Sequence, residues 1–158
     1  MRKDCIEIER KFLVSGDFKE SAVESFRIVQ GYLSTSAGVT VRVRIKGEKA
    51  YLTIKGKTSD SGMSRFEWER EIPHDEAAGL LELCGGKVID KTRYIVPFGG
   101  YVFEVDEFHG DNTGLLMAEI ELSSEEDEFD KPEWLGQEVT GDVRYYNSQL
   151  LHDPVNKW

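Results

Sequence analysis

The stretch IEIERKF, residues 6–12, alternates apolar and charged side chains in a pattern that decides the fold. In a β-strand every second side chain lies on the same face, so Glu7, Glu9 and Lys11 share one face. The opposite face is apolar, interrupted only by Arg10. The stretch therefore predicts a strand with one fully charged face.

Charged residues recur on one face of other strand-like segments along the chain. These positions are, in order, Arg42, Arg44, Lys55, Glu67, Glu69, Lys91, Arg93, Glu104, Asp106, Glu119 and Glu121. For any single strand, the ordinary interpretation is the solvent face of an antiparallel sheet. Solvent faces usually mix Thr, Ser, Lys and Gln, whereas these segments repeat acids and bases. The repetition favours a second interpretation, in which the charged faces meet inside a closed sheet.

Eight strands separated by glycine-rich turns are expected from the period-2 pattern. We expect them at residues 5–14, 26–33, 39–46, 50–57, 65–72, 87–96, 101–108 and 115–122. Their short connections predict antiparallel neighbours. Eight such strands are enough to close a barrel, whose interior is filled by one set of alternating residues. The expected fold class is α+β: an eight-stranded antiparallel β-barrel with flanking helices.

Three helices are expected outside the strands, near residues 17–23, 73–84 and 142–151. Asp17 can cap the first helix, which would bury Phe18, Ala22 and Val23. The second begins near Pro73 and ends at two consecutive glycines. If the apolar faces of the strands pack outward against these helices, the charged faces line the lumen of the barrel.

Length and composition indicate one globular domain over residues 1–158. The net charge of −10 argues against general nucleic-acid binding through a basic surface. No stretch is apolar enough for a membrane span, and the N-terminus does not resemble a secretory leader. The two cysteines, Cys5 and Cys84, form neither a disulfide framework nor a zinc site. We therefore expect a cytoplasmic protein without membrane association, and a homodimer is compatible with the sequence.

A charged lumen is costly unless ligands compensate it, and its two charge sets suggest which ligands do. The cations Lys11, Arg42, Arg44, Lys55, Lys91 and Arg93 suit a polyanion with several phosphates. Glu7, Glu9, Glu119 and Glu121 would repel that polyanion, but carboxylates bind Mg²⁺ or Mn²⁺, which in turn bridge to phosphate oxygens. The sequence therefore predicts a tunnel for metal and phosphate.

The frame Glu7-x-Glu9-x-Lys11 resembles the ExExK signature of the CYTH superfamily, the triphosphate tunnel metalloenzymes. ExExK alone is a weak signal, because short charged alternations occur by chance. The resemblance extends in the family's order to QGYL at 30–33, VRVR at 41–44, TIK at 53–55, FEWE at 66–69, KTRY at 91–94, FEVD at 103–106 and AEIEL at 118–122. It therefore covers nearly the whole chain.

The resemblance implies roles for the charged residues. Glu7, Glu9 and Glu121 correspond to metal ligands, with Glu119 beside them. The residues that correspond to triphosphate contacts are Lys11, Arg42, Arg44, Lys55 and Arg93, with Lys91 in the same stripe. Lumen acids that orient these cations or help to hold a second metal are Glu67, Glu69, Glu104 and Asp106. As catalytic residues the resemblance implies Lys11, Glu69 and Lys91. The segment with Arg144 and Tyr145 resembles a C-terminal helix that closes one tunnel mouth.

The activity implied by the resemblance is metal-dependent hydrolysis of a triphosphate compound, foremost inorganic tripolyphosphate to pyrophosphate and phosphate. A second metal or a lumen carboxylate would position the attacking water. Thiamine, RNA or other organic triphosphatase activity and cyclisation of ATP remain alternatives from the same family. Cyclases usually carry an aromatic residue or His just ahead of the signature, where this chain has Asp4 and Cys5. The non-enzymatic alternative is a module that binds polyphosphate or nucleotide without turnover.

Overall fold

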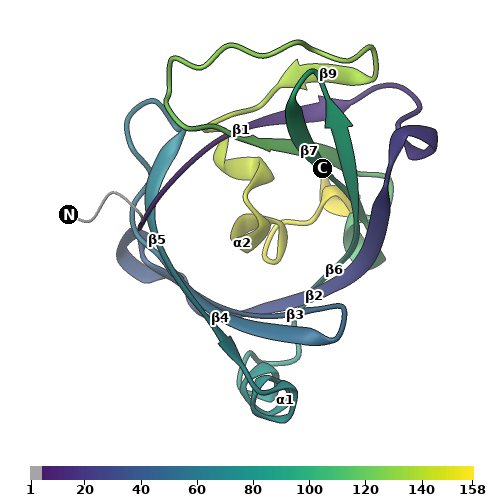
Figure 1. Ribbon diagram of the computed structural model, residues 1–158. Coiled ribbons are helices and arrows are strands. Elements are labelled where there is room, and N and C mark those ends of the chain that lie inside the picture. The colour runs from purple at the N-terminus through teal and green to yellow at the C-terminus, as the bar shows by residue number, and fades with distance from the viewer. Residues whose placement is uncertain (1–4) are drawn as a thin grey trace.

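The computed structural model describes residues 5–158 and shows a closed antiparallel β-barrel, viewed along its axis in Figure 1. Its strands are β1 (Ile6–Val14), β2 (Glu24–Ser34), β3 (Thr40–Lys46), β4 (Lys49–Lys55), β5 (Ser64–Ile72), β6 (Ile89–Phe98), β7 (Tyr101–Phe108) and β8 (Leu116–Glu121). Around the barrel the order is β5-β4-β3-β2-β6-β7-β8-β1, and β1 returns to pair with β5. The predicted eight-stranded antiparallel barrel is confirmed.

Strand β1 closes the barrel because its two halves pair with different partners. Residues Ile6–Ile8 pair with β5, and Glu9–Leu13 pair with β8. A short ninth strand, β9 (Leu135–Glu138), adds to the second half of β1 outside the ring. Strand β9 was not predicted, because its four residues, with a glycine among them, carry no period-2 pattern. Glu7, Glu9 and Lys11 of β1 therefore lie where the barrel closes between β5 and β8.

The apolar faces of the strands point out of the barrel, as the alternation predicts. Phe12, Phe103 and Ile120 are buried there, beneath Trp134 and the partly buried Phe129 from the segment that precedes β9. On the opposite side, helix α1 (His74–Glu82) packs Leu80 and Leu81 over Val43 and Ala50 of β3 and β4. Most of the lumen is therefore left to the charged side chains, except where Phe108, opposite Lys91, and Ile89 form an apolar cluster with the C-terminal segment.

Of the predicted helices, only the second is observed as a regular helix, α1. The first is a single 3₁₀ turn, η2 (Lys19–Ser21), which buries Phe18 but leaves Val23 71% exposed. No room exists for a longer helix, because β2 already begins at Glu24. The third is broken into η5 (Val143–Tyr145) and α2 (Asn147–Leu150), because Tyr146 between them is extended, with φ −69° and ψ 135°.

Three further 3₁₀ turns complete the chain: η3 (Ser36–Gly38), η4 (Gly110–Asn112) and η6 (Val155–Lys157). The C-terminal segment folds back over one mouth of the barrel, where α2 lies in front of the opening (Figure 1). Tyr145 and Leu150 of this segment are buried against Ile89 and Phe108. Across residues 5–158, no helix has the length and apolar character needed to cross a membrane.

The loop before β5 meets the loop after β9 at two glycines, Gly62 and Gly141. Gly62 has φ +79°, and a Cβ built on it would lie 2.6 Å from Gly141 Cα. Gly62→Ala should therefore combine backbone strain with a backbone clash and lower stability by about 2–3 kcal/mol, a fall in Tm of about 5–10 °C. Gly47→Ala is the matched control, because Gly47 has φ +59° with nothing within 4 Å of its Cβ. Thermal melting checks the pair, and equal Tm values would contradict the importance of the contact.

Candidate active site

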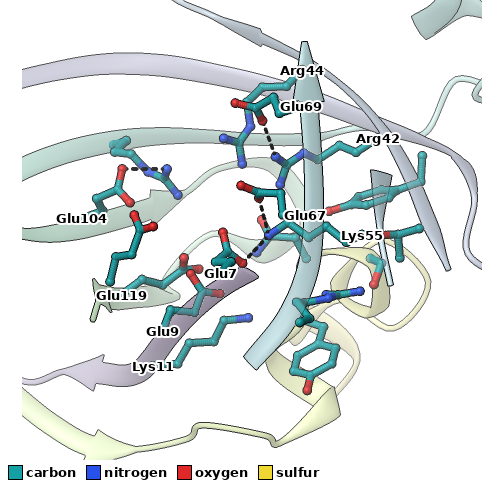
Figure 2. Close-up of a pocket in the computed structure, with 18 of the residues that line it drawn as sticks. Glu7, Glu9, Lys11, Arg42, Arg44, Lys55, Glu67, Glu69, Glu104 and Glu119 are labelled. Atoms are coloured by element: carbon teal, nitrogen blue, oxygen red, sulfur yellow. Dashed lines mark hydrogen bonds and ion pairs between the residues drawn. The ribbon is translucent and has the colours of Figure 1, made fainter. Parts of the chain in front are cut away.

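The barrel encloses a cavity of about 150 Å³ that is lined almost wholly by charged side chains. The candidates that line it are Glu7, Glu9, Lys11, Arg42, Arg44, Lys55, Glu69, Lys91, Arg93, Glu119 and Glu121. Figure 2 shows side chains from strands on all sides converging on this space. Every metal, substrate and catalytic candidate therefore lies at one cavity, and the individual roles stay predictions.

Four carboxylates form one wall of the cavity, on the neighbouring strands β1 and β8. Glu9 stands opposite Glu121 in the register, and Lys11 stands opposite Glu119. Burial and the negative charges of Glu119 and Glu7 raise the pKa of Glu9 well above its usual value. Burial alone would also raise the pKa of Glu119, but the positive charges of Lys11, Arg93 and Lys91 lower it. The wall therefore favours a proton on Glu9 when no cation is bound.

The acidic wall fits a hard divalent cation in its chemistry, because all its donors are carboxylate oxygens. Within residues 5–158, however, no three acidic side chains are grouped closely enough to form a ready-made metal centre. Glu7, for example, accepts a 2.8 Å hydrogen bond from Lys55. Mg²⁺ is usually held by one or two carboxylates together with substrate phosphates rather than by a cage of protein ligands. The wall suits a cation that shares its coordination with phosphate oxygens.

Two of the lumen cations, Arg42 on β3 and Lys55 on β4, form ion pairs with acids. Lys55 lies 2.8 Å from Glu7 and 3.3 Å from Glu67, and these acids raise its pKa although burial would lower it. Arg42 Nη2 donates to Thr53 Oγ1 at 3.1 Å and lies 3.4 Å from Glu69 Oε2. Within residues 5–158, Arg42 Nε is buried without a hydrogen-bond partner. Arg42 thus keeps an unused donor beside the cavity.

A second group of charges centres on Asp106, which is 1% exposed. Arg93 donates to both its oxygens at 2.8 and 2.9 Å, and Lys91 Nζ lies 2.7 Å from Oδ2. Burial would raise the pKa of Asp106, but these two cations lower it. Burial, together with Arg93 and Arg44, lowers the pKa of Lys91 to about 7 despite the attraction of Asp106. One buried aspartate is therefore shared by two cations.

The remaining cations, Arg44 and Lys11, form no ion pair with any residue in the range 5–158. Arg44 Nε donates to the side-chain carbonyl of Gln30 at 3.0 Å. Burial and the charges of Arg42 and Arg93 lower the pKa of Arg44 to about 10. Lys11 Nζ lies 4.6 Å from the ring centre of Tyr146. Neither side chain is neutralised by a direct ion pair in the described part of the chain, although Lys11 interacts with Glu119 opposite it on β8, so both should attract an anion.

The C-terminal segment reaches the cavity through residues other than those expected. Tyr145 is buried in an apolar cluster, and Arg144 is exposed and paired with Asp142 at 2.8 Å. Tyr146 and Asn147 line the cavity instead. They follow no strand or helix periodicity, so no pattern in the sequence pointed to them.

Gln30, which is fully buried, also contacts the lumen side chains, through Tyr32, Arg44 and Asn147. Its sequence signal was a polar residue at an inward strand position between Ile28 and Tyr32. Tyr32 and Arg65 line the cavity too. From the sequence, the position of Tyr32 allows either a lumen hydroxyl near the phosphates or a core residue, whereas Arg65 follows the same alternation as Glu67 and Glu69 without being among the candidates.

Known proteins resemble this chain over nearly its whole length. It is 50% identical over 153 residues to an inorganic triphosphatase of Acetivibrio thermocellus, covering 96% of this chain and 97% of the relative. It is 37% identical over 148 residues to an inorganic triphosphatase of Nitrosomonas europaea, covering 91% and 95% of the two chains. The crystal structure of the inorganic triphosphatase NE1496 superposes with a TM-score of 0.67 at 34% identity, covering 92% and 93%.

The family comparison agrees with these relatives. The CYTH domain matches residues 5–148, which run from the start of the described chain into α2. This range contains all eight strands of the barrel and every residue proposed above for the lumen. The chain belongs to the CYTH domain family.

Proposed function

We propose that this protein hydrolyses inorganic tripolyphosphate to pyrophosphate and phosphate, with Mg²⁺ or Mn²⁺ as the metal. The observation that carries the proposal is the pairing, in one cavity, of an acidic wall with cations that no acid fully neutralises. The curated relatives that are 50% and 37% identical, both inorganic triphosphatases, support the same activity. Among residues 5–158, the aromatic side chains of the cavity lining are Tyr32 and Tyr146, and the Tyr146 ring already contacts Lys11, which favours an inorganic substrate.

In this proposal the cations bind the phosphates and the acids bind the metal. The phosphate ligands are Lys11, Arg42, Arg44, Lys55, Lys91 and Arg93, and the metal ligands are Glu7, Glu9, Glu119 and Glu121. When bound, the metal offsets the negative charge that develops on the phosphate oxygens. Lys11 and Lys91 act as the catalytic cations that neutralise the same charge from the protein side.

Glu69 is our candidate for positioning the attacking water. Its Oε2 accepts hydrogen bonds from Thr53 at 2.6 Å and Arg42 at 3.4 Å, which fix the carboxylate at the cavity. Its Oε1 has no partner among residues 5–158 and is available to a water molecule. A carboxylate held in this way can orient the water toward the terminal phosphorus and accept its proton.

Phosphate release from tripolyphosphate, with and without Mg²⁺ or Mn²⁺, tests the proposal. We expect turnover that requires the metal and is abolished by a chelator. Parallel reactions with ATP and thiamine triphosphate, and an assay for cyclic AMP, examine the alternative activities. Faster turnover of an organic triphosphate, or formation of cyclic AMP, would replace the proposed substrate. Binding of tripolyphosphate without any turnover would indicate a binding module.

Arg42→Ala should reduce the thermal stabilisation that tripolyphosphate and Mg²⁺ confer. At several hundred times its dissociation constant, the ligand should stabilise the wild-type protein by roughly 3–4 kcal/mol. Loss of one charged phosphate contact, worth about 1.5–3 kcal/mol, should remove about half of this effect and raise KM. Arg42→Lys should recover only part, because a point charge replaces a two-pronged donor. Melting temperatures with and without ligand check this, and a full wild-type shift in Arg42→Ala would exclude Arg42 as a phosphate ligand.

A further inference from the structure

The lumen cations differ in the kind of group that holds them. Lys55 and Arg42 are paired with acids, and Arg93 has both Asp106 and Glu104. Arg44 and Lys11 are held by uncharged groups alone, the Gln30 amide and the Tyr146 ring. Lys91 shares Asp106 with Arg93 and donates its other hydrogen bond to the side-chain oxygen of Asn147.

Two amide side chains connect Lys91 to Arg44 through the C-terminal segment. Asn147 Oδ1 accepts from Lys91 Nζ at 2.9 Å and from Gln30 Nε2 at 3.3 Å. Gln30 Oε1 in turn accepts from Arg44 Nε at 3.0 Å. Lys91 and Gln30 are both buried, so these bonds are shielded from water. We call the chain Arg44–Gln30–Asn147–Lys91 the amide relay.

The charge of the group that accepts a cation's hydrogen bond affects how strongly that cation attracts an anion. A carboxylate beside Lys91 or Arg44 would fix the side chain but also cancel its charge. An amide oxygen fixes the side chain without adding negative charge, which matters for Lys91 because it already shares Asp106 with Arg93. The amide relay therefore orients two lumen cations without placing further negative charge beside them.

The C-terminal segment does not need Asn147 to stay in place. Tyr145 and Leu150, on either side of it, are buried in an apolar cluster with Ile89 and Phe108. Leu150 is 0% exposed, so this anchor alone should keep α2 over the tunnel mouth. The contacts of Asn147 are consequently free to serve the cations rather than the fold.

We propose that Asn147 and Gln30 are positioning residues for phosphate binding, which aim Lys91 and Arg44 into the tunnel as uncharged hydrogen-bond acceptors. The inference rests on the proposed function in that it takes the phosphates of tripolyphosphate as the ligand. It assigns a role to the C-terminal segment that goes beyond covering the tunnel mouth: the segment completes the phosphate site.

Asn147→Asp is the sharpest test, because it keeps the acceptor and the shape while replacing the amide NH₂ by a charged carboxylate oxygen. We expect an unchanged or raised Tm, a KM for tripolyphosphate about tenfold higher, and a smaller change in kcat. Calorimetric binding of tripolyphosphate without metal should weaken by the same factor. Gln149→Glu adds the same charge two residues away at an exposed position and should stay within about twofold of wild type.

Two further variants extend the test. Asn147→Leu removes the hydrogen-bond acceptor of Lys91, and Gln30→Glu places a negative charge beside Arg44. Both should weaken binding of tripolyphosphate, Asn147→Leu by releasing Lys91 and Gln30→Glu by neutralising Arg44.

Wild-type affinity in Asn147→Asp, or equal weakening in Gln149→Glu, would overturn the relay. If the wild-type protein binds tripolyphosphate without cleaving it, the hydrolase fails while the binding comparison still decides the relay. If the wild-type protein does not bind tripolyphosphate at all, both the proposed hydrolase activity and the amide relay are overturned.

Discussion

Glu9→Gln is expected to lower the turnover of tripolyphosphate at least about 100-fold while leaving the fold intact. A metal contributes several kcal/mol of transition-state stabilisation, and each 1.36 kcal/mol lost is about a tenfold loss in rate. Glutamine keeps the size of the side chain but removes the charge that a cation requires. The effect should therefore fall on catalysis and on the affinity for metal.

Stability without metal should be unchanged or higher in Glu9→Gln. The raised pKa of Glu9 favours its neutral form, which glutamine resembles in shape and charge. Because the folded protein holds this proton more tightly than the unfolded chain does, ionisation of Glu9 costs stability as pH rises through the range between the two pKa values. Glutamine removes that cost, so any gain in Tm over wild type should grow with pH.

Steady-state kinetics over a range of metal concentrations, combined with thermal melting, check these expectations. Glu71→Gln is the matched control, because Glu71 is exposed and lies 3.9 Å from Lys49 outside the cavity. It should retain turnover within about twofold of wild type. Near wild-type turnover of Glu9→Gln at saturating metal would remove Glu9 from the metal ligands.

The barrel could be predicted from the sequence because its determinants are local and repeated. The charged alternation of residues 6–12 recurs in most of the other strands, though not in β2, and a shift by one residue would move a whole charged stripe into the apolar outer layer. The strand β9 lacked this signal, since it joins β1 mainly through backbone hydrogen bonds. The predicted helix at residues 142–151 was wrong because helix signals do not reveal that Tyr146 is extended.

The membership of the candidate site was predictable, but its pairing was not. The alternation of side chains along β6 predicts that Lys91 and Arg93 face the lumen. Only the pairing register of β6 with β7 places Arg93 beside Asp106. Contacts between segments that are far apart along the chain are even harder to predict from the sequence. Asn147 meets Lys91 across 56 residues of sequence, and an asparagine in a loop is ordinary in composition. The sequence therefore identified most of the charged residues, though not Lys46 and Arg65, and missed the amide side chains that hold Lys91 and Arg44.

Asp106→Asn should give a large loss of stability, because it leaves two buried cations without their shared acid. Removal of one partner of a buried ion pair typically costs about 3–5 kcal/mol, since the remaining charge is uncompensated. Arg93 would retain Glu104 at 3.0 Å, but Lys91 would have no acid among residues 5–158 within ion-pair distance. For a chain of this size we expect a fall in Tm of about 10–15 °C.

The acid sensitivity of the protein should change in the same variant. The pKa of Asp106 is lowered in the folded state, so its contribution to stability is present above the pKa of the unfolded chain and is lost as pH falls through the folded value. Asp106→Asn removes this contribution at every pH, so the variant should lose less Tm than wild type on acidification. Glu107→Gln, the next position on β7, is the control: its ion pair with Lys19 at 3.3 Å lies at the surface and should be worth at most about 1 kcal/mol.

Tripolyphosphate should restore part of the stability that Asp106→Asn loses. The anion supplies negative charge beside Lys91 and Arg93, which in the variant no longer share an aspartate. The rise in Tm on adding tripolyphosphate should therefore be larger in Asp106→Asn than in wild type or Glu107→Gln, measured at equal ligand concentration. A rise no larger than that of wild type would mean that the phosphates do not approach these two cations. The phosphate site would then be confined to the other lumen cations, Lys11, Arg42, Arg44 and Lys55.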